Sequence, residues 1–150
     1  ILDTRKTTPG WRELEKYAVR VGGGKNHRMS LSDMMLIKDN HIRIAGGITA
    51  ALEKAKEKVR PGVKIEIEAT NLQEVEEALK GGADIIMLDN MKLEAIRQAV
   101  EMVSGRVALE VSGKVNIRTV REIALTGVNF ISVGALTHSF RSSDISLEFT

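Results

Sequence analysis

Five polar or small residues stand directly after apolar runs of this 150-residue sequence, in places where chemistry could occur. They are Lys38, Glu68, Asp89, Ser112 and Gly134. In parallel α/β folds, ligands bind at the carboxyl ends of the strands. Any one of these residues could simply mark a solvated strand end. Five of them together favour a shared site at one edge of a sheet.

Two carboxylates also belong to one of these runs. Glu66 and Glu68 alternate with Ile65 and Ile67, and the two-residue period of a strand puts each pair on its own face. We expect the isoleucines to face helices and the carboxylates to face the interior of a barrel. Charges that point inward need partners or a site. The alternative is an edge strand with one wet face, in which both carboxylates would be freely solvated.

Glycines follow the last two apolar runs, in segments 111–114 and 133–138. Glycine lets backbone N–H groups approach an anion, and a helix that starts after the loop adds its dipole. Barrel enzymes often bind phosphate with two consecutive loops of this kind. The pair of segments therefore predicts a phosphate site.

Cationic residues gather in the first third of the chain, at predicted loop positions and strand ends. They are Arg5, Lys6, Lys25, His27, Arg28, Lys38 and His41. Guanidinium groups suit a substrate that bears carboxylates. A solvated basic face is the alternative for the group, and a capping or packing role is the alternative for His27. Lys38 could instead form a Schiff base.

Histidine spacing gives no sign of a dedicated metal cage. Glu68 and Asp89 could hold Mg²⁺ together with substrate phosphates, as Mg²⁺ often requires.

Six short runs rich in isoleucine and valine are predicted to be strands, at 1–2, 34–37, 63–67, 85–88, 107–111 and 130–133. Helical patterns lie between them. The first begins near Pro9, carries Trp11, Leu14, Ala18 and Val21 at helical spacing, and stops at glycines 22–24. Others are expected over 50–59, from a cap at Asn71 to glycines 81–82, over 93–103, and from a cap at Asn116 to Leu125.

Strands that alternate with helices predict a parallel sheet. A faint internal repeat, 82–89 over 127–134, supports βα units around one axis. We therefore expect one domain, 1–150, with an α/β fold: a partial or open (β/α) barrel of about six parallel strands with helices outside. A doubly wound sheet is the alternative. A complete eight-fold barrel is excluded because it needs roughly 250 residues.

Composition excludes several classes of protein. With no cysteine there is no disulfide framework, and a net charge of +2 with 3% aromatic residues argues against nucleic acid binding. No apolar run is long enough to cross a membrane, and we expect a cytoplasmic location. The chain opens without methionine, which suggests a fragment. Near its end, Ile145, Leu147 and Phe149 alternate with polar residues as a strand does, and we expect this tail to pair with something outside these residues.

Several motifs resemble one known family, quinolinate phosphoribosyltransferase, also called carboxylating nicotinate-nucleotide pyrophosphorylase. They are segments 3–10 (DTRKTTPG), 16–20 (KYAVR), 22–24 (GGG), 26–28 (NHR), 36–41 (LIKDNH), 87–90 (MLDN) and 133–139 (VGALTHS). The resemblance implies transfer of a phosphoribosyl group from phosphoribosyl pyrophosphate to quinolinate, with Mg²⁺. The products are nicotinate mononucleotide, pyrophosphate and CO₂, on the route to NAD.

The resemblance also implies roles for residues. Those that bind substrate would be Thr4, Arg5, Lys6, His27, Arg28 and Lys38. Lys38, Glu68 and Asp89 would be catalytic, and the two carboxylates would hold ribose hydroxyls directly or through Mg²⁺. The 5′-phosphate would be held by Ser112, Gly113, Lys114, Gly134 and Ala135.

This sequence departs from the family in two ways. The family usually has two glycines after the serine, whereas Lys114 follows Gly113 here. The family also has an N-terminal α/β domain, absent here, that supplies an arginine to the neighbouring subunit. We therefore expect a homodimer or higher homo-oligomer for the full-length protein, and weak or no activity for these 150 residues alone. Two alternatives stay open: a Schiff-base lyase or aldolase that uses Lys38, and a non-catalytic phosphate-binding fragment.

Overall fold

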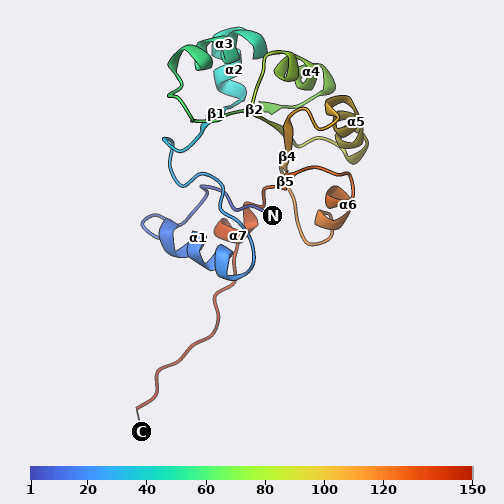
Figure 1. Cartoon of the computed structure of the whole chain (residues 1–150). Helices are drawn as coiled ribbons and strands as arrows, with labels where there is room; N and C mark the ends of the chain where they lie inside the picture. Colours follow the sequence, from blue (N-terminus) through green and yellow to red (C-terminus); the bar gives the residue numbers. More distant parts are fainter. Residues whose placement is uncertain (150) are drawn as a thin grey trace.

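A computed structural model describes residues 1–149 of the chain. Its centre is a curved, five-stranded parallel sheet whose strands lie side by side in chain order (Figure 1). The strands are β1 (Met35–Ile37), β2 (Ile65–Ala69), β3 (Ile85–Asp89), β4 (Ala108–Ser112) and β5 (Phe130–Ile131). The sheet does not close into a complete barrel, which confirms the predicted partial barrel.

Helices connect the strands. They are α1 (Arg12–Val21), α2 (Asp39–Ala45), α3 (Ile48–Lys58), α4 (Leu72–Lys80), α5 (Leu93–Val103), α6 (Val120–Ala124) and α7 (Ala135–His138). Figure 1 shows α2 to α6 along the outer side of the sheet, while α1 and α7 lie together near the N-terminus. A doubly wound sheet would carry helices on both faces. That alternative is therefore wrong.

The two faces of the sheet differ sharply in polarity. Outward-facing residues such as Ile67, Ile86 and Leu88 are fully buried in the apolar core beneath the helices. On the inner face, Glu66 is fully buried and Glu68 is 8% exposed. The prediction of inward carboxylates is confirmed, and the wet edge strand is wrong.

The sixth predicted strand, at 1–2, is reduced to bridges made by one residue. Leu2 bridges both Lys25 and Ser132, and its N–H donates to the carbonyl of Ile131 at 2.8 Å. Leu2 thus continues the sheet beyond β5. Beyond Leu2, the N–H of Asp3 donates to the carbonyl of Lys25 at 3.1 Å, and no longer strand forms.

Helix α1 does not bury the apolar stripe seen in the sequence. Trp11, Leu14 and Val21 are more than half exposed, whereas Lys16 and Val19 are buried. Helical spacing predicted the helix correctly but not the face that it buries. The buried lysine has a specific partner, so its burial overrides the hydrophobic pattern.

Side-chain capping explains where two helices begin. Asn71 accepts a hydrogen bond from the N–H of Glu74 at 3.0 Å, which confirms the predicted cap of α4. Asn116 instead accepts from the N–H of Arg118 at 2.9 Å, inside a turn. The carbonyl of Asn116 also accepts from the N–H of Val120 at 2.9 Å, and the regular helix α6 begins only at Val120. Helix α2, which was not predicted, is seven residues long.

Residues 139–149 form no helix or strand within the described part of the chain. Ile145, Leu147 and Phe149 are each more than 80% exposed. The strand expected in this tail is therefore not formed against residues 1–149, and an outside partner remains a prediction. No helix over the described residues is both long and apolar enough to span a membrane.

Candidate functional site

The ends of β1 and β2 are joined by an ion pair. Lys38, the residue after β1, contacts the carboxylate of Glu68 through its Nζ atom, and the N–H of Asp39 donates to the same carboxylate at 3.3 Å. The Glu68 side chain is 10% exposed and that of Lys38 is 49% exposed. A buried carboxylate and an accessible ammonium therefore meet at the strand ends, as a binding site requires.

Asp89 lies at the same edge of the sheet. Glu68 is in register with Met87, and Asp89 stands two residues beyond Met87, so it shares the inner face. Asp89 is itself in register with Ser112, and its Oδ2 accepts from Asn90 at 2.9 Å. The structure thus brings Lys38, Glu68, Asp89 and Ser112 to one end of four neighbouring strands.

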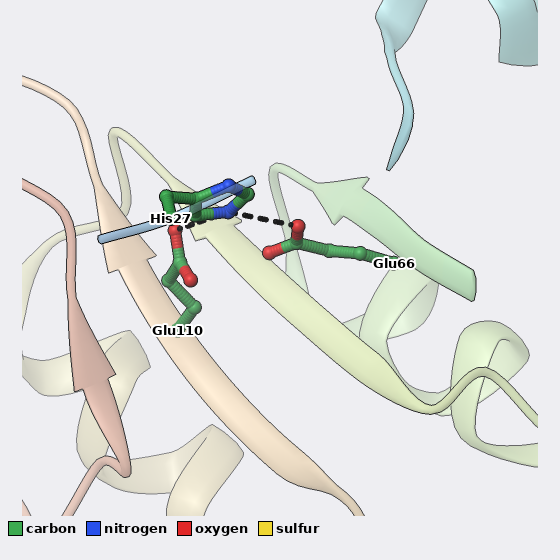
Figure 2. Close-up of side chains that lie close together, drawn as sticks. All are labelled: His27, Glu66 and Glu110. Carbon is green, nitrogen blue, oxygen red and sulfur yellow. Dashed lines mark hydrogen bonds and ion pairs between the residues drawn. The ribbon is translucent and has the colours of Figure 1, made fainter. Parts of the chain in front are cut away.

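His27 lies on the inner face of the sheet, between two buried glutamates (Figure 2). Its Nε2 is 3.1 Å from Oε2 of Glu66 and 3.5 Å from Oε1 of Glu110. Burial, together with the charge of Glu66, raises the pKa of Glu110 to about 7. Burial opposes the charged form of His27, but its hydrogen bond to Glu66 and the charge of Glu110 outweigh that effect, so the pKa of His27 is raised. His27 thus packs against specific partners, and its ring is oriented by them.

These three residues also have the separation expected of metal ligands. However, Nδ1 of His27 accepts a hydrogen bond from the N–H of Arg28 at 2.8 Å. The ring proton therefore sits on Nε2, the atom that faces both carboxylates. A metal ion needs the lone pair of that atom and an acceptor for Nδ1. The cluster suits a shared proton and does not fit a metal ion.

Two arginines beside His27 form a cationic pair. Burial, and then the charge of Arg5, lower the pKa of Arg28. Arg28 donates to the carbonyl of Met34 at 2.9 Å, and Nε of Arg5 is buried with no hydrogen-bond partner among the described residues. An anion bound here would reduce the repulsion between the two guanidinium groups. It would also accept a hydrogen bond from the buried Nε of Arg5.

Three other residues of the cationic cluster have different surroundings. Nδ1 of His41 accepts from the N–H of Lys38 at 3.0 Å, which caps α2. Lys25 is exposed, and its backbone bridges Leu2. Lys6 is exposed as well, and its N–H donates to Oγ1 of Thr4 at 3.2 Å.

The loop after β4 approaches the one after β3 closely. Gly113 has φ +99°, and a Cβ atom there would lie 2.4 Å from Oδ1 of Asn90. Lys114 also has a positive φ, +52°, which explains why glycine suits this position. Ser112, Gly113 and Lys114 border a cavity of about 310 Å³ that Asn90 and Thr119 also line. This loop requires a glycine, but no helix follows it directly, in contrast to the sequence-based expectation.

The second glycine loop brings Thr4 and an unpredicted histidine together. A Cβ atom on Gly134 would lie 2.9 Å from Nε2 of His138 and 3.7 Å from Oγ1 of Thr4. Ala135, exposed, begins the four-residue helix α7. His138 was not singled out from the sequence because it stands alone on a short segment after the glycine.

Sequence reasoning also missed the role of Glu110. Its Oε1 accepts from Oγ of Ser132 at 2.5 Å, and its Oε2 has no partner among residues 1–149. A single carboxylate inside the apolar run 107–111 was the available signal, since strand periodicity places it inward beside Glu66.

Comparisons with known proteins give consistent matches over the whole chain. The family described as "Quinolinate phosphoribosyl transferase, C-terminal domain" matches residues 1–148. A chloroplastic nicotinate-nucleotide pyrophosphorylase [carboxylating] of Oryza sativa subsp. japonica is 48% identical over 99% of this chain and 45% of its own length. A probable enzyme of the same name from Bacillus subtilis (strain 168) is 46% identical over the whole chain and 52% of its own length.

Solved structures give the same result. The crystal structure of NadC from Streptococcus pyogenes has a TM-score of 0.93 and 45% identity, and covers 99% of this chain and 52% of that one. A thiamine phosphate pyrophosphorylase from Pyrococcus furiosus, 23% identical with a TM-score of 0.56, shares the fold over 89% of this chain and 70% of its own. This chain spans about half the length of the curated relatives that it matches.

Proposed function

We propose, from the premise that this chain belongs to the quinolinate phosphoribosyltransferase family and corresponds to its C-terminal domain, that the whole protein is a carboxylating nicotinate-nucleotide pyrophosphorylase. It transfers a phosphoribosyl group from phosphoribosyl pyrophosphate to quinolinate and releases pyrophosphate and CO₂, a step of NAD biosynthesis. The observation that carries the proposal is the convergence of Lys38, Glu68 and Asp89 at one strand edge.

Quinolinate, a pyridine with two carboxylates, is assigned to the cationic residues. Arg5, Arg28 and Lys38 neutralise its two negative charges, and His27, Thr4 and Lys6 complete this part of the site. The unused buried Nε of Arg5 supports this assignment, since a carboxylate oxygen satisfies it. So does the proximity of Arg5 to Arg28, whose mutual repulsion an anion relieves.

The ribose of the second substrate is assigned to Glu68 and Asp89. When the ring nitrogen bonds to C1 of the ribose, the bond from C1 to pyrophosphate breaks and positive charge develops on the sugar. Fixed carboxylates stabilise that charge. Lys38 holds Glu68 in place and, with Lys6, offers a cation to the phosphates.

Mg²⁺ fits this part of the site, because Glu68 and Asp89 present carboxylate oxygens, which Mg²⁺ prefers. These residues would hold the ion together with the substrate. An ion held there would supply positive charge that balances the charge of the pyrophosphate.

The 5′-phosphate is assigned to the two glycine loops, with Ser112, Gly113 and Lys114 on one and Gly134 and Ala135 on the other. The close approach of Gly113 to Asn90, which leaves no room for a Cβ atom, supports a backbone that comes near its ligand. Backbone N–H groups, the Ser112 hydroxyl and the Lys114 ammonium are then the donors, with no need for a long helix behind the loop.

Loss of CO₂ follows from the new bond to nitrogen. The ribosylated ring nitrogen carries positive charge, so it stabilises the electron pair that stays on C2 when the bond from C2 to the carboxylate breaks. A proton then adds to C2, which gives nicotinate mononucleotide. The part of these residues is to orient the ring, neutralise charge and exclude water.

The ion pair with Glu68 weakens the case for the Schiff-base alternative. Nζ of Lys38, the atom that would have to form an imine, is already engaged by the carboxylate of Glu68. Borohydride trapping on Lys38 would support the alternative, and its absence with turnover of quinolinate supports the transferase.

The whole protein is expected to be a homodimer or higher homo-oligomer in the cytoplasm, with no nucleic acid or membrane partner. These points rest on the family and on composition. Sedimentation of the whole protein tests the expected oligomeric state.

The direct test is turnover by the whole protein. Quinolinate, phosphoribosyl pyrophosphate and Mg²⁺ should give nicotinate mononucleotide and CO₂ in equal amounts, and omission of any one substrate should abolish both products. Phosphate binding without any product would instead identify a non-catalytic protein.

A further inference from the structure

Asp3 and Lys16 form an ion pair that the proposed chemistry does not use. Nζ of Lys16 donates to Oδ1 of Asp3 at 2.5 Å, and the two side chains are 1% and 0% exposed. Burial of a charge pair is costly, and apolar residues of similar size often replace such a pair with no loss of stability. The contacts made by this pair point to a role besides stability.

Both residues also bind the backbone of His27. The N–H of His27 donates to Oδ1 of Asp3 at 2.9 Å, and Nζ of Lys16 donates to the carbonyl of His27 at 2.9 Å. The ion pair therefore uses both polar groups of that peptide segment. An apolar pair could not make either bond.

Asn26 ties the two charged residues together. Its Nδ2 atom donates to Oδ2 of Asp3 at 2.5 Å and to the carbonyl of Lys16 at 2.9 Å. Three segments that are distant in sequence are joined in this way: residue 3 beside β5, helix α1, and residues 26–27.

No regular secondary structure holds residues 26–28 in place. They belong to no helix or strand, since the bridge to Leu2 ends at Lys25. Yet His27 and Arg28 must be held in place, because His27 lies between Glu66 and Glu110 and Arg28 lies beside Arg5. Hydrogen bonds from the buried pair supply the restraint that a strand ladder would otherwise supply.

We infer that Asp3, Lys16 and Asn26 are positioning residues for the carboxylate-binding part of the site. They act through the backbone of His27, and they fix His27 and Arg28 for an aromatic dicarboxylate. The inference rests on the proposed function, and it assigns the residues no contact with substrate.

The test compares four variants of the whole protein: Lys16→Met, Asp3→Asn, the double variant Asp3→Asn/Lys16→Met, and Lys80→Met as a control. Lys80 pairs with Glu76 on the exposed surface of α4. Thermal unfolding, kcat, and the KM values for quinolinate and phosphoribosyl pyrophosphate are measured, together with quinolinate affinity by calorimetry.

Each single variant leaves one buried charge unpaired, so both should lower Tm. The double variant leaves none, and its Tm should recover toward that of the wild type. Its quinolinate KM and Kd should nevertheless rise about tenfold, since the hydrogen bond from Lys16 to His27 is lost and that to Asp3 is weakened. The KM for phosphoribosyl pyrophosphate should stay within about twofold, because its phosphate is assigned to β4 and β5.

A double variant with the quinolinate affinity of the wild type would overturn the inference, as would equal losses for both substrates. If the double variant does not fold, Asn26→Ala decides, because it keeps the ion pair. It should raise the quinolinate KM selectively, by about threefold, and unchanged values would overturn the inference. Wild-type protein that neither binds quinolinate nor forms product would instead overturn the proposed function, and with it the inference.

Discussion

At the scale of single residues, the inner face of the sheet is controlled by charges in close contact. Glu66 and Glu110 are both buried, and each has one oxygen without a hydrogen-bond partner among residues 1–149. Two adjacent carboxylates in a buried place cannot easily both be ionised. Burial, and then the charge of Glu66, therefore raise the pKa of Glu110 to about 7.

This shift makes stability depend on pH. The ordinary pKa of a glutamate is 4.5, and the pKa of Glu110 in the folded protein is about 7. Between these values the folded state binds a proton that the unfolded state has released, so the free energy of unfolding falls as pH rises through this window. The fall attributable to Glu110 is on the order of 3 kcal/mol. Glu110→Gln, which resembles the protonated form, should remove it.

Urea unfolding from pH 4 to pH 8 measures this effect. The free energy of unfolding of Glu110→Gln minus that of wild type should increase as pH rises, because only the wild type loses stability. This difference should level off above about pH 7. Glu101→Gln, a change at an exposed glutamate of α5, is the control and should follow the wild type. A constant difference between Glu110→Gln and wild type across this range would contradict the assignment.

Arg28→Ala tests the division of the site between carboxylates and phosphate. Loss of its charge-assisted hydrogen bonds should weaken quinolinate binding about 10- to 100-fold. Binding of phosphoribosyl pyrophosphate should change less than about threefold, because its phosphate is assigned to other strands. Calorimetry on the whole protein measures both, with the exposed Arg97→Ala as the control. Equal losses for the two substrates would refute this division.

At the scale of elements, the loop after β4 carries a conformation that favours glycine. Lys114 has φ +52°, and so does Asn90 in the neighbouring loop. A residue with a Cβ atom is strained in this region, by about 1 kcal/mol. The loop therefore retains some strain at the position where the resemblance predicts a second glycine.

Lys114→Gly should relieve that strain and stabilise the protein by up to about 1 kcal/mol. If the ammonium of Lys114 also contacts phosphate, the KM for phosphoribosyl pyrophosphate should rise a few-fold in the same variant. Ser104→Gly is the matched control, since Ser104 has φ +50° at the end of α5. It should stabilise by a similar amount and leave both KM values unchanged. Destabilisation by Lys114→Gly, measured by chemical unfolding, would be the contrary result.

Periodicity predicted most elements because the relevant signals are local. Helix α5 has the predicted bounds, and β2 to β5 lie within two residues of theirs. Strand periodicity also placed Glu66 and Glu68 on the inner face. Local signals could not show that residues 117–119 form a turn, so the late start of α6 at Val120 was missed.

The candidate site could be predicted only where each residue marks a strand end or belongs to a motif. Lys38, Glu68 and Asp89 were found in that way. The buried pair of Asp3 and Lys16 was not, because an aspartate and a lysine 13 residues apart give no local sign that they meet. Such pairs are set by tertiary structure, here by the packing of α1 near the N-terminus.

At the scale of the whole molecule, apolar surface is concentrated around α1 and α7. A cavity of about 610 Å³ is lined there by Ile1, Trp11, Leu14, Ala18, Leu136 and Phe140. The exposed tail with Ile145 and Leu147 follows α7 directly. Soluble monomers rarely expose continuous apolar patches of this kind.

The 150 residues alone are expected to have little or no activity. The resemblance implies that one arginine of the quinolinate site comes from outside them, and loss of a single charged contact costs about 10- to 100-fold in binding. Assays of the isolated chain beside the whole protein, under the same conditions, test this. Full turnover by the isolated chain would contradict the expectation.

The most direct test is a crystal structure of the whole protein with quinolinate bound. Arg5, His27, Arg28 and Lys38 should surround the two carboxylates, and the ring nitrogen should face the open end of the sheet, toward Glu68 and Asp89. A dicarboxylate bound away from Lys38, or coordinates in which Glu68 and Asp89 face different regions, would contradict the proposed site.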